Sequence, residues 1–259
     1  MTNRMWLVSA SERRAGRAGA SVRAPYGLEI VENCTECPNR NDRLFCNLPD
    51  PAVRRLAGIT APSTYPKGAT LFVEGQEPRG VFILCSGKVK LSTSSADGKT
   101  LILRISDPGE VLGLAATVCG RPYHATATVL EPAQANFVSK ADFLNFLGEF
   151  GEAALRVSQQ MGENYHLALA EMKTIGLSHS ATEKLARFVL EWCAEHDAGN
   201  GQVRANLTLT HEEIAQIIGA SRETVTRLLS EFRRKQLLQI KGHTLIIRDK
   251  PGLQQLATN

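Results

Sequence analysis

Three cysteines near the start of the chain have the residue type and spacing of a metal site. Cys34 and Cys37 form a C-x-x-C pair, and Cys46 follows after eight intervening residues in NCTECPNRNDRLFCNLP. Two thiolates on one turn can coordinate a metal, and the following segment can supply a third thiolate ligand. A closed tetrahedral or cluster site needs a fourth ligand. The alternative is a set of reduced thiols with no metal.

The remaining cysteines supply the candidates for that fourth ligand. Cys85 lies in VFILCSG, which reads as a buried strand, and Cys193 lies beside Trp192 on a predicted helix, so both are expected in the core. Cys119 lies in TVCGRPY, a predicted loop, and is the best candidate. We expect these six cysteines to be thiols or metal ligands rather than a disulfide framework.

A second stretch whose residue types could serve a binding function is Thr210 to Arg234, THEEIAQIIGASRETVTRLLSEFRR. Thr210 and Glu213 have the spacing of a capping box, which begins a helix. Gly219 can end that helix in a left-handed conformation, and Ser221 can cap a second helix. The apolar positions of the second helix are Val225, Leu228, Leu229 and Phe232.

The polar face of this second helix carries Arg222, Glu223, Thr226 and Arg227. Arginines, a carboxylate and a hydroxyl at the N-terminal end of a short capped helix suit contacts with base edges in a DNA major groove. The alternative is a helical hairpin with a solvated charged face.

The overall composition fits this interpretation. The chain has 259 residues and a formal net charge of +4, which is compatible with an acidic partner. No run of about 18 apolar residues occurs, so we expect no membrane span, and the N-terminus is not a convincing secretory signal. The cytoplasm is the expected location. No nucleophile–base set or phosphate-binding loop is present, so we do not expect an enzyme.

The elements that would position these residues differ along the chain. Residues 50 to 59 predict a short helix, and residues 64 to 139 predict short strands separated by glycine turns, including Ser86-Gly87 and Asp97-Gly98. That pattern indicates a β-sandwich or β-roll. The fold class is therefore α+β, with an N-terminal β-roll followed by helices.

The second half of the chain predicts mainly helices. Residues 152 to 175 form a long helix with two apolar stripes, which predicts a dimer, although a core helix within a single chain is the alternative. A helix is expected from Ala181 to His196 and a loop from Asp197 to Asn206. Two strands around Lys241 would form a wing that rests on a phosphate backbone.

We predict four parts in the chain. Residues 1–30 form a mobile basic tail, and residues 31–148 form the cysteine segment and β-roll sensor domain. Residues 149–178 form the dimerisation helix. Residues 179–259 form a winged helix-turn-helix domain.

This order of parts, with LTLTHEEIAQIIGASRETVTRLLSEF followed by LLQIKGHTLII, resembles the Crp/Fnr family of bacterial transcription regulators over about residues 50 to 257. The resemblance implies a cyclic-nucleotide-binding-like roll and a homodimer that binds a palindromic DNA site and contacts RNA polymerase. It implies that Arg222, Glu223 and Arg227 read bases in a GTGA-like half-site. Ser221 and Thr226 would serve as cap or phosphate contacts. A signalling module without a DNA role is the alternative.

Two further implications concern the signal. Family members that bind cyclic AMP carry a Gly-Glu pair and a later Arg-Ser pair, but here Leu114 follows Gly113, and Tyr123 and His124 take the later positions. We therefore expect poor cyclic nucleotide binding.

Fnr-like members hold a [4Fe-4S] cluster on N-terminal cysteines, which Cys34, Cys37 and Cys46 resemble. The position of the usual fourth ligand aligns with Asn136, which leaves Cys119 as the candidate. Zinc, no metal and a different small effector stay open as alternatives.

Overall fold

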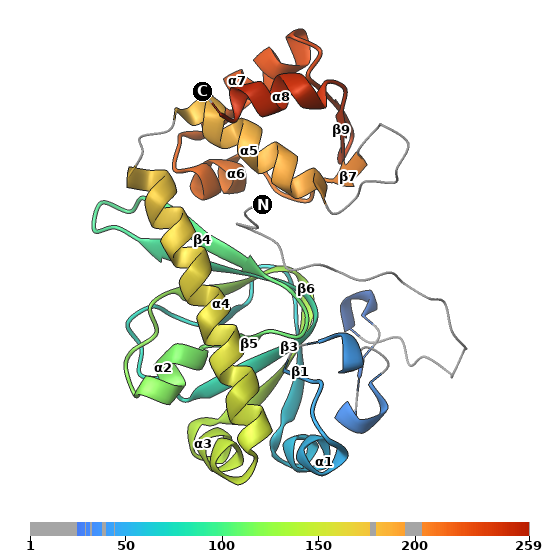
Figure 1. Cartoon of the computed structure of the whole chain (residues 1–259), viewed down its shortest axis with the longest axis vertical. Coiled ribbons are helices and arrows are strands. Elements are labelled where there is room, and N and C mark those ends of the chain that lie inside the picture. The colour runs from blue at the N-terminus through green and yellow to red at the C-terminus, as the bar shows by residue number, and fades with distance from the viewer. Residues whose placement is uncertain are drawn as a thin grey trace. The chain divides into compact units, whose positions relative to one another are not determined.

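The computed structural model describes residues 25–28, 30–31, 33–37, 40–43, 45–176, 180–194 and 204–258 (Figure 1). Within these ranges the chain forms two compact units. One holds the residues before Ser94 together with Leu103–His166, and the other holds Ser94–Ile102 and the chain from Leu167 onward. Most of the predicted basic tail, and the predicted boundary after residue 178, lie outside the described residues.

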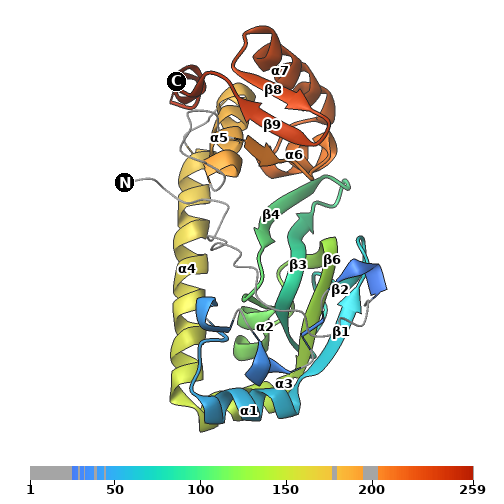
Figure 2. The ribbon, with the colours of Figure 1, turned by 90° about the vertical axis from the view of Figure 1, so that its right-hand side faces the viewer.

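The first unit is built on a six-stranded sheet, as the predicted β-roll requires (Figure 2). The strands are β1 (Ala61–Tyr65), β2 (Thr70–Phe72), β3 (Gly80–Ser94), β4 (Thr100–Ser106), β5 (Val111–Leu112) and β6 (Thr126–Ser139). Their order is β1-β6-β3-β4, with β2 paired to β6 and β5 paired to β3. β1 and β3 both run antiparallel to β6, so β6 lies between two strands that are distant in sequence.

The two faces of β3 and β6 belong to different parts of the core. Alternate residues of a strand point to opposite faces. The inner face packs inside the roll with Phe72 and Tyr123, and it carries Phe82, Leu84, Ala133 and Ala135. The outer face packs against helices, and it carries Val81, Ile83 and Val138. Gln134 and Asn136 follow the same alternation as Val138, so they belong to the outer face.

One predicted turn is wrong. Ser86-Gly87 lies inside the continuous strand β3, where the register with β6 shifts. Gly87 has φ 78°, and an added Cβ would lie 2.2 Å from the carbonyl oxygen of Pro132. The glycine therefore permits a bulge and a close strand approach rather than a chain reversal. The predicted turn at Asp97-Gly98 is confirmed, since the Gly98 amide donates to the Ser95 carbonyl oxygen.

Helices cover the outer face at one end of the sheet. The helices of this part are η1 (Pro25–Gly27), η2 (Cys34–Glu36), η3 (Arg40–Asp42), α1 (Asp50–Ile59), α2 (Leu114–Cys119), α3 (Lys140–Glu149) and α4 (Gly151–Gly176). Phe143 of α3 packs on Phe45, and Leu56 of α1 joins the same core cluster. The predicted helix at residues 50–59 is confirmed, whereas the predicted loop around Cys119 is wrong because Cys119 ends α2.

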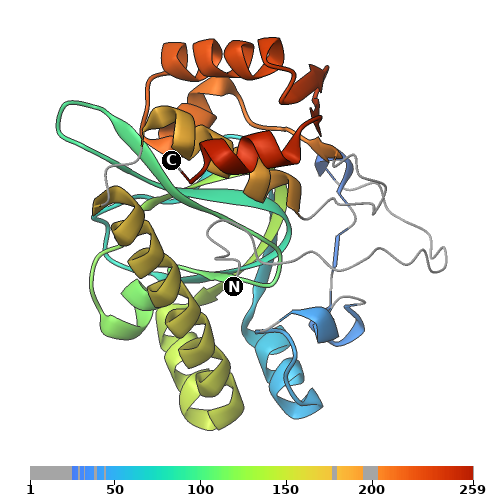
Figure 3. The same cartoon turned by 45° about the horizontal axis from the view of Figure 1, so that its top comes forward.

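Helix α4 is one unbroken helix of 26 residues (Figure 3). Its first half is fixed to the roll by Gln160, whose side chain accepts from the Val111 amide at 3.1 Å and donates to the Val111 carbonyl oxygen at 2.9 Å. Ala153 and Val157 are buried on the same side. No helix among the described residues is long and apolar enough to cross a membrane.

The second unit combines helices with a small three-stranded sheet. Its elements are α5 (Ala181–Ala194), β7 (Arg204–Asn206), α6 (His211–Ile218), α7 (Arg222–Arg234), β8 (Leu238–Lys241), β9 (Thr244–Ile247) and α8 (Lys250–Leu256). The predicted wing is confirmed as β8 and β9. The loop predicted up to Asn206 is wrong at its end, because β7 pairs with β9 and Trp192 donates to the Asn206 carbonyl oxygen.

Candidate functional site

The turn between α6 and α7 is fixed by local contacts. The Thr210 hydroxyl accepts from the Glu213 amide at 3.2 Å, and the Glu213 carboxylate accepts from the Thr210 amide at 2.9 Å. Gly219 ends α6 with φ 65°, which a side chain would disfavour. Ser221 then caps α7 by accepting from the Thr224 amide at 3.2 Å. The predicted caps are all present, so this stretch sets the entry angle of α7.

Helix α7 has one buried and one exposed side. Val225, Leu228, Leu229 and Phe232 are at most 3% exposed, as the spacing predicts. Arg222, Glu223, Thr226 and Arg227 are exposed, and we name these four the DNA-reading face after the role that the sequence predicts for them. With Ser230 they line a shallow hollow. The DNA-reading face therefore combines two cations, one carboxylate and one hydroxyl within two helical turns.

Thr226 is the most constrained member of the DNA-reading face. Its hydroxyl donates to the Arg222 carbonyl oxygen at 2.9 Å and lies 2.9 Å from Nδ1 of His211 on α6. These contacts fix the hydroxyl between the two helices. Sequence reasoning missed His211, whose position beside Thr226 depends on how α6 and α7 cross.

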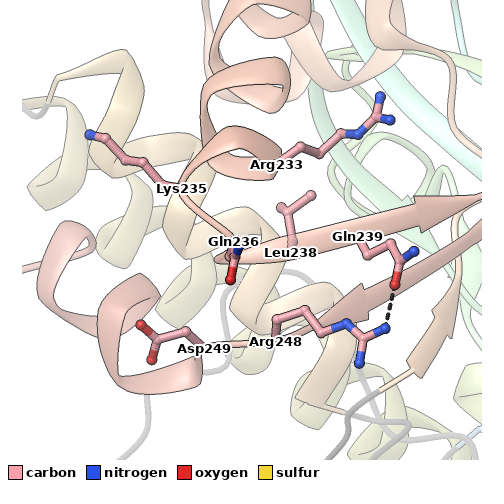
Figure 4. Close-up of a pocket in the computed structure, with 7 residues that line it drawn as sticks. All are labelled: Arg233, Lys235, Gln236, Leu238, Gln239, Arg248 and Asp249. Atoms are coloured by element: carbon pink, nitrogen blue, oxygen red, sulfur yellow. Dashed lines mark hydrogen bonds between the residues drawn. The ribbon is translucent and has the colours of Figure 1, made fainter.

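Positive charge continues beyond the DNA-reading face. Lys241 is exposed at the end of β8, on the wing. A hollow at the C-terminal end of α7 carries Arg233, Lys235 and Arg248 (Figure 4). Arg248 donates to Gln239, and Asp249 caps α8 by accepting from the Gly252 amide at 2.9 Å. This hollow adds positive charge while its polar side chains hold the wing and α8 in place.

The predicted cysteines lie on the outer side of the roll. Cys34 and Cys46 are half-buried and pack against the cluster that contains Ile83 and Val138. Burial, then the Cys37 thiolate, raises the pKa of Cys34, while a hydrogen bond from Asn136 opposes the shift. Burial raises the pKa of Cys46 to about 12, although Arg43 opposes this. Unliganded, these two thiols are therefore neutral at pH 7.

A relay of amides holds this segment on the sheet. Gln134 of β6 is fully buried, and its side chain accepts from the Val31 amide at 2.8 Å and donates to the Val31 carbonyl oxygen at 2.7 Å. Gln134 also donates to Asn136 at 3.3 Å, and Asn136 donates to the Cys34 sulfur at 3.8 Å. Thus the position aligned with the family's fourth ligand does lie beside Cys34.

The other cysteines separate into three environments. Cys119 is exposed, and it is not among the thiols that interact with Cys34 or Cys46 in the described structure. Cys193 is buried in α5, as predicted, and burial raises its pKa to about 12. Cys85 is buried in β3, as predicted. It also lies within electrostatic reach of Cys46, Cys34 and Cys37, which sequence reasoning missed.

Two protein families match the two units. The cyclic nucleotide-binding domain family matches residues 62–150, and the Crp-like helix-turn-helix domain family matches residues 183–256. A similar protein is the CRP-like cAMP-activated global transcriptional regulator of Mycobacterium tuberculosis, with 26% identity over 83% of this chain and 96% of that protein. The global nitrogen regulator of Synechocystis sp. is 28% identical over 79% of this chain and 93% of that protein.

This chain belongs to the Crp/Fnr family of transcriptional regulators. Its activity is therefore regulatory rather than catalytic, and α6 and α7 are the helix-turn-helix of a DNA-binding domain.

Solved structures share the fold of this Crp/Fnr protein. FixK2 from Bradyrhizobium japonicum superposes with a TM-score of 0.67 and 21% identity, covering 78% of this chain and 98% of FixK2. A CooA mutant from Carboxydothermus hydrogenoformans superposes with a TM-score of 0.65 and 22% identity, covering 78% of this chain and 89% of CooA.

The roll of this Crp/Fnr protein differs from the cyclic-AMP pattern where the sequence predicts it. Tyr123 is buried at 5% exposure, stacks on Phe72 with ring centroids 4.0 Å apart, and donates to the Gly80 carbonyl oxygen at 2.8 Å. A Cβ added to Gly113 would lie 2.7 Å from the Tyr123 ring. The phenol ring thus packs against the glycine of the resembled phosphate motif, and His124 is exposed.

Proposed function

We propose that this regulator acts as a homodimer that reads a two-fold-symmetric, GTGA-like DNA site and contacts RNA polymerase. The observation that carries the proposal is the DNA-reading face at the capped N-terminal end of α7. A helix inserted in the major groove presents the residues of its first turns to the base edges. Half-sites one helical turn apart then require two copies of α7.

The members of the face have different roles in this proposal. Arg222 and Arg227 donate to guanine O6 and N7, and Glu223 accepts from a cytosine N4 amine. Ser221 and Thr226 position the helix and contact phosphates, since their hydroxyls already bond within α6 and α7. Lys241 on the wing neutralises a phosphate without reading sequence.

Dimerisation is proposed along α4. Leu155, Tyr165 and Leu169 are 58%, 63% and 36% exposed, although all three are large and apolar. Leu155 and Leu169 are two heptads apart, and Tyr165 precedes Leu169 by four residues, which is the spacing of a coiled-coil seam. Burial of this seam against a second copy removes it from water.

For the sensor, we propose that Cys34, Cys37 and Cys46 contribute to a [4Fe-4S] site whose state depends on oxygen. The donor chemistry fits, because thiolates are the usual ligands of such clusters. Bound there, a cluster would supply redox-dependent bonds between the cysteine segment and the roll. Cyclic nucleotide is not the proposed effector, because the buried Tyr123 offers no cation to a phosphate.

The DNA proposal is tested by selecting binding sequences from a random pool with the purified protein. We expect a palindrome with GTGA-like half-sites, and a protein that sediments as a dimer. Leu155→Glu with Tyr165→Glu should give a monomer that binds the palindrome weakly. Selection of an asymmetric or unrelated sequence by the native protein would contradict the proposal.

The sensor proposal is tested by purification without oxygen, followed by visible absorbance, iron and sulfide analysis, and DNA binding before and after exposure to air. A colourless, iron-free protein whose DNA binding ignores oxygen would rule it out. Zinc in place of iron would identify a structural thiolate site instead.

A further inference from the structure

Cys85 occupies an unusual position in strand β3. Leu84 lies opposite Ala135 of β6 and Ser86 lies opposite Gln134, so β3 contains one extra residue at Cys85. A bulge leaves its extra residue outside the regular pairing and can redirect its side chain. The Cys85 sulfur lies 3.6 Å from the Ile83 carbonyl oxygen, and Ile83 belongs to the outer face.

Two thiols of the cysteine segment lie on that same outer face of the sheet. Cys34 and Cys46 pack on the cluster that contains Ile83. Burial raises the pKa of Cys85 to about 12, and the neighbouring thiolates of Cys46, Cys34 and Cys37 add to the increase. Cys85 is thus a buried thiol within electrostatic reach of the three thiols of the cysteine segment.

Asn136 lies next to this group without supplying a thiol. It pairs with Ile83 in the β3–β6 register, so Cys85 is its diagonal neighbour on the adjacent strand. Its amide nitrogen lies 3.8 Å from the Cys34 sulfur, so it is a donor toward that sulfur. An amide cannot replace a thiolate as a cluster ligand, but an N–H donor to a ligand sulfur is a recognised way to tune a cluster.

We propose that Cys85 is the fourth thiolate of the metal site, with Cys34, Cys37 and Cys46, and that Asn136 orients Cys34 by donating a hydrogen bond to its sulfur. The proposal rests on the sensor function proposed above. It moves the fourth ligand from the β6 position now held by Asn136 to the bulge of β3, and it excludes the exposed Cys119.

The donor set of this site is four sulfurs and no carboxylate. No group of three or more His, Cys, Asp or Glu side chains in the described ranges is already arranged to hold a single metal ion. The half-buried segment of Cys34, Cys37 and Cys46 must therefore tighten on Cys85 when metal binds, and each thiol must release its proton. Metal binding would then link three sulfurs of the cysteine segment to one sulfur of the sheet.

The test is a matched series of cysteine substitutions, each purified without oxygen and assayed for iron, sulfide, visible absorbance and thermal unfolding. Cys85→Ser should lose the iron, sulfide and thiolate-to-iron absorbance of the native protein. Cys119→Ser, at an exposed thiol, should keep all three. Cys193→Ser controls for the loss of a buried thiol elsewhere and should also keep them.

A second variant separates ligand loss from misfolding. Asn136→Cys in the Cys85→Ser background places a thiol diagonally across from the lost one, and we expect it to restore at least part of the iron and absorbance. Asn136→Ala alone should keep the iron while shifting the reduction potential measured by redox titration.

The outcomes distinguish the two proposals. A native protein without iron and sulfide would overturn both. A native protein with a cluster that Cys85→Ser retains in full would overturn only the Cys85 assignment, and loss of the cluster in Cys119→Ser instead would assign the fourth ligand to Cys119.

Discussion

The DNA-reading face and the cysteine site of this protein are constructed in opposite ways. The DNA-reading face comes from four residues within a six-residue span of α7, and the cap, turn glycine and buried side of this helix all lie within Thr210–Arg234. The proposed cysteine site combines Cys34, Cys37 and Cys46 of the cysteine segment with Cys85 of β3, and buried Gln134 and Asn136 bond to Val31 and Cys34 of that segment.

The difference shows how the two regions can respond to conditions. The backbone of the DNA-reading face is fixed by the cap and the buried side of α7, without any ligand. The cysteine site has neutral, half-buried thiols and a segment attached through a few hydrogen bonds, so its geometry depends on what it binds. In the proposed function, α7 contacts DNA and the cysteine region senses the signal.

The largest effect, a loss of folding stability, is expected from removing the hydrogen bonds that hold the cysteine segment on the sheet. Gln134→Leu leaves the amide and carbonyl of Val31 without their partner, and unsatisfied buried groups cost about 1–3 kcal/mol each. We expect a loss of about 2–4 kcal/mol in urea unfolding of the first unit. Hydrogen exchange at the Val31 amide should accelerate. Unchanged exchange would show that the segment is held elsewhere.

The DNA-reading face should respond in binding rather than in stability. Arg222→Ala should weaken binding to the preferred palindrome by about 1–3 kcal/mol and relax one base position, measured by titration against single-base variants. The matched control is Arg234→Ala, which removes an exposed arginine from the last turn of the same helix. Equal losses of sequence preference in both variants would contradict the proposed contacts.

In the DNA-binding unit, Glu191 of α5 is a half-buried ionisable group. Burial raises its pKa from 4.5 to about 7, Arg187 opposes the shift, and one carboxylate oxygen has no hydrogen-bond partner. Because the folded protein holds this proton more tightly, stability should fall as pH rises from about 4.5 to about 7 and stay reduced above that.

Glu191→Gln should therefore stabilise the protein by about 1–2 kcal/mol at pH 8 and change little at pH 4. The measurement is urea unfolding at both pH values, with the exposed Glu163→Gln as the control. A stabilisation that does not depend on pH would assign the effect to packing rather than to ionisation.

Removing the N-cap of α7 tests how far local contacts stabilise the DNA-reading face. Ser221→Ala removes the hydroxyl that accepts from the Thr224 amide, which should cost about 1 kcal/mol of stability. The same variant should weaken DNA binding slightly for every sequence, because α7 loses its defined start. A selective loss at one base would instead make Ser221 a base contact.

The smallest effect is expected at the wing. Lys241→Ala should make the negative slope of log affinity against log salt concentration shallower by about 0.9, because one phosphate contact is lost. Sequence preference should not change, in contrast to Arg222→Ala. An unchanged slope would place Lys241 away from the DNA backbone.

The sequence predicted those features of the structure that depend on residues close together in the chain. The capping box of Thr210 and Glu213, the left-handed Gly219 and the buried Val225 and Phe232 follow from residues a few positions apart. The same holds for the hairpin at Asp97-Gly98. Local propensities and periodicity carry enough energy there to specify the element.

The predictions that were wrong concern residues whose structure depends on segments far away in the chain. Ser86-Gly87 has the composition of a turn, but pairing with β6 keeps it inside β3, and pairing with β9 makes residues 204–206 a strand. Cys119 was favoured because a loop can move, yet it ends α2 and is exposed.

The sequence by itself therefore determined the DNA-reading face, since one short helix with its own caps supplies all four side chains. Only the tertiary structure showed that Cys85 lies within electrostatic reach of the thiols of the cysteine segment. A bulge in β3 and the register with β6 set the position of Cys85, and register depends on segments that are far apart in the chain.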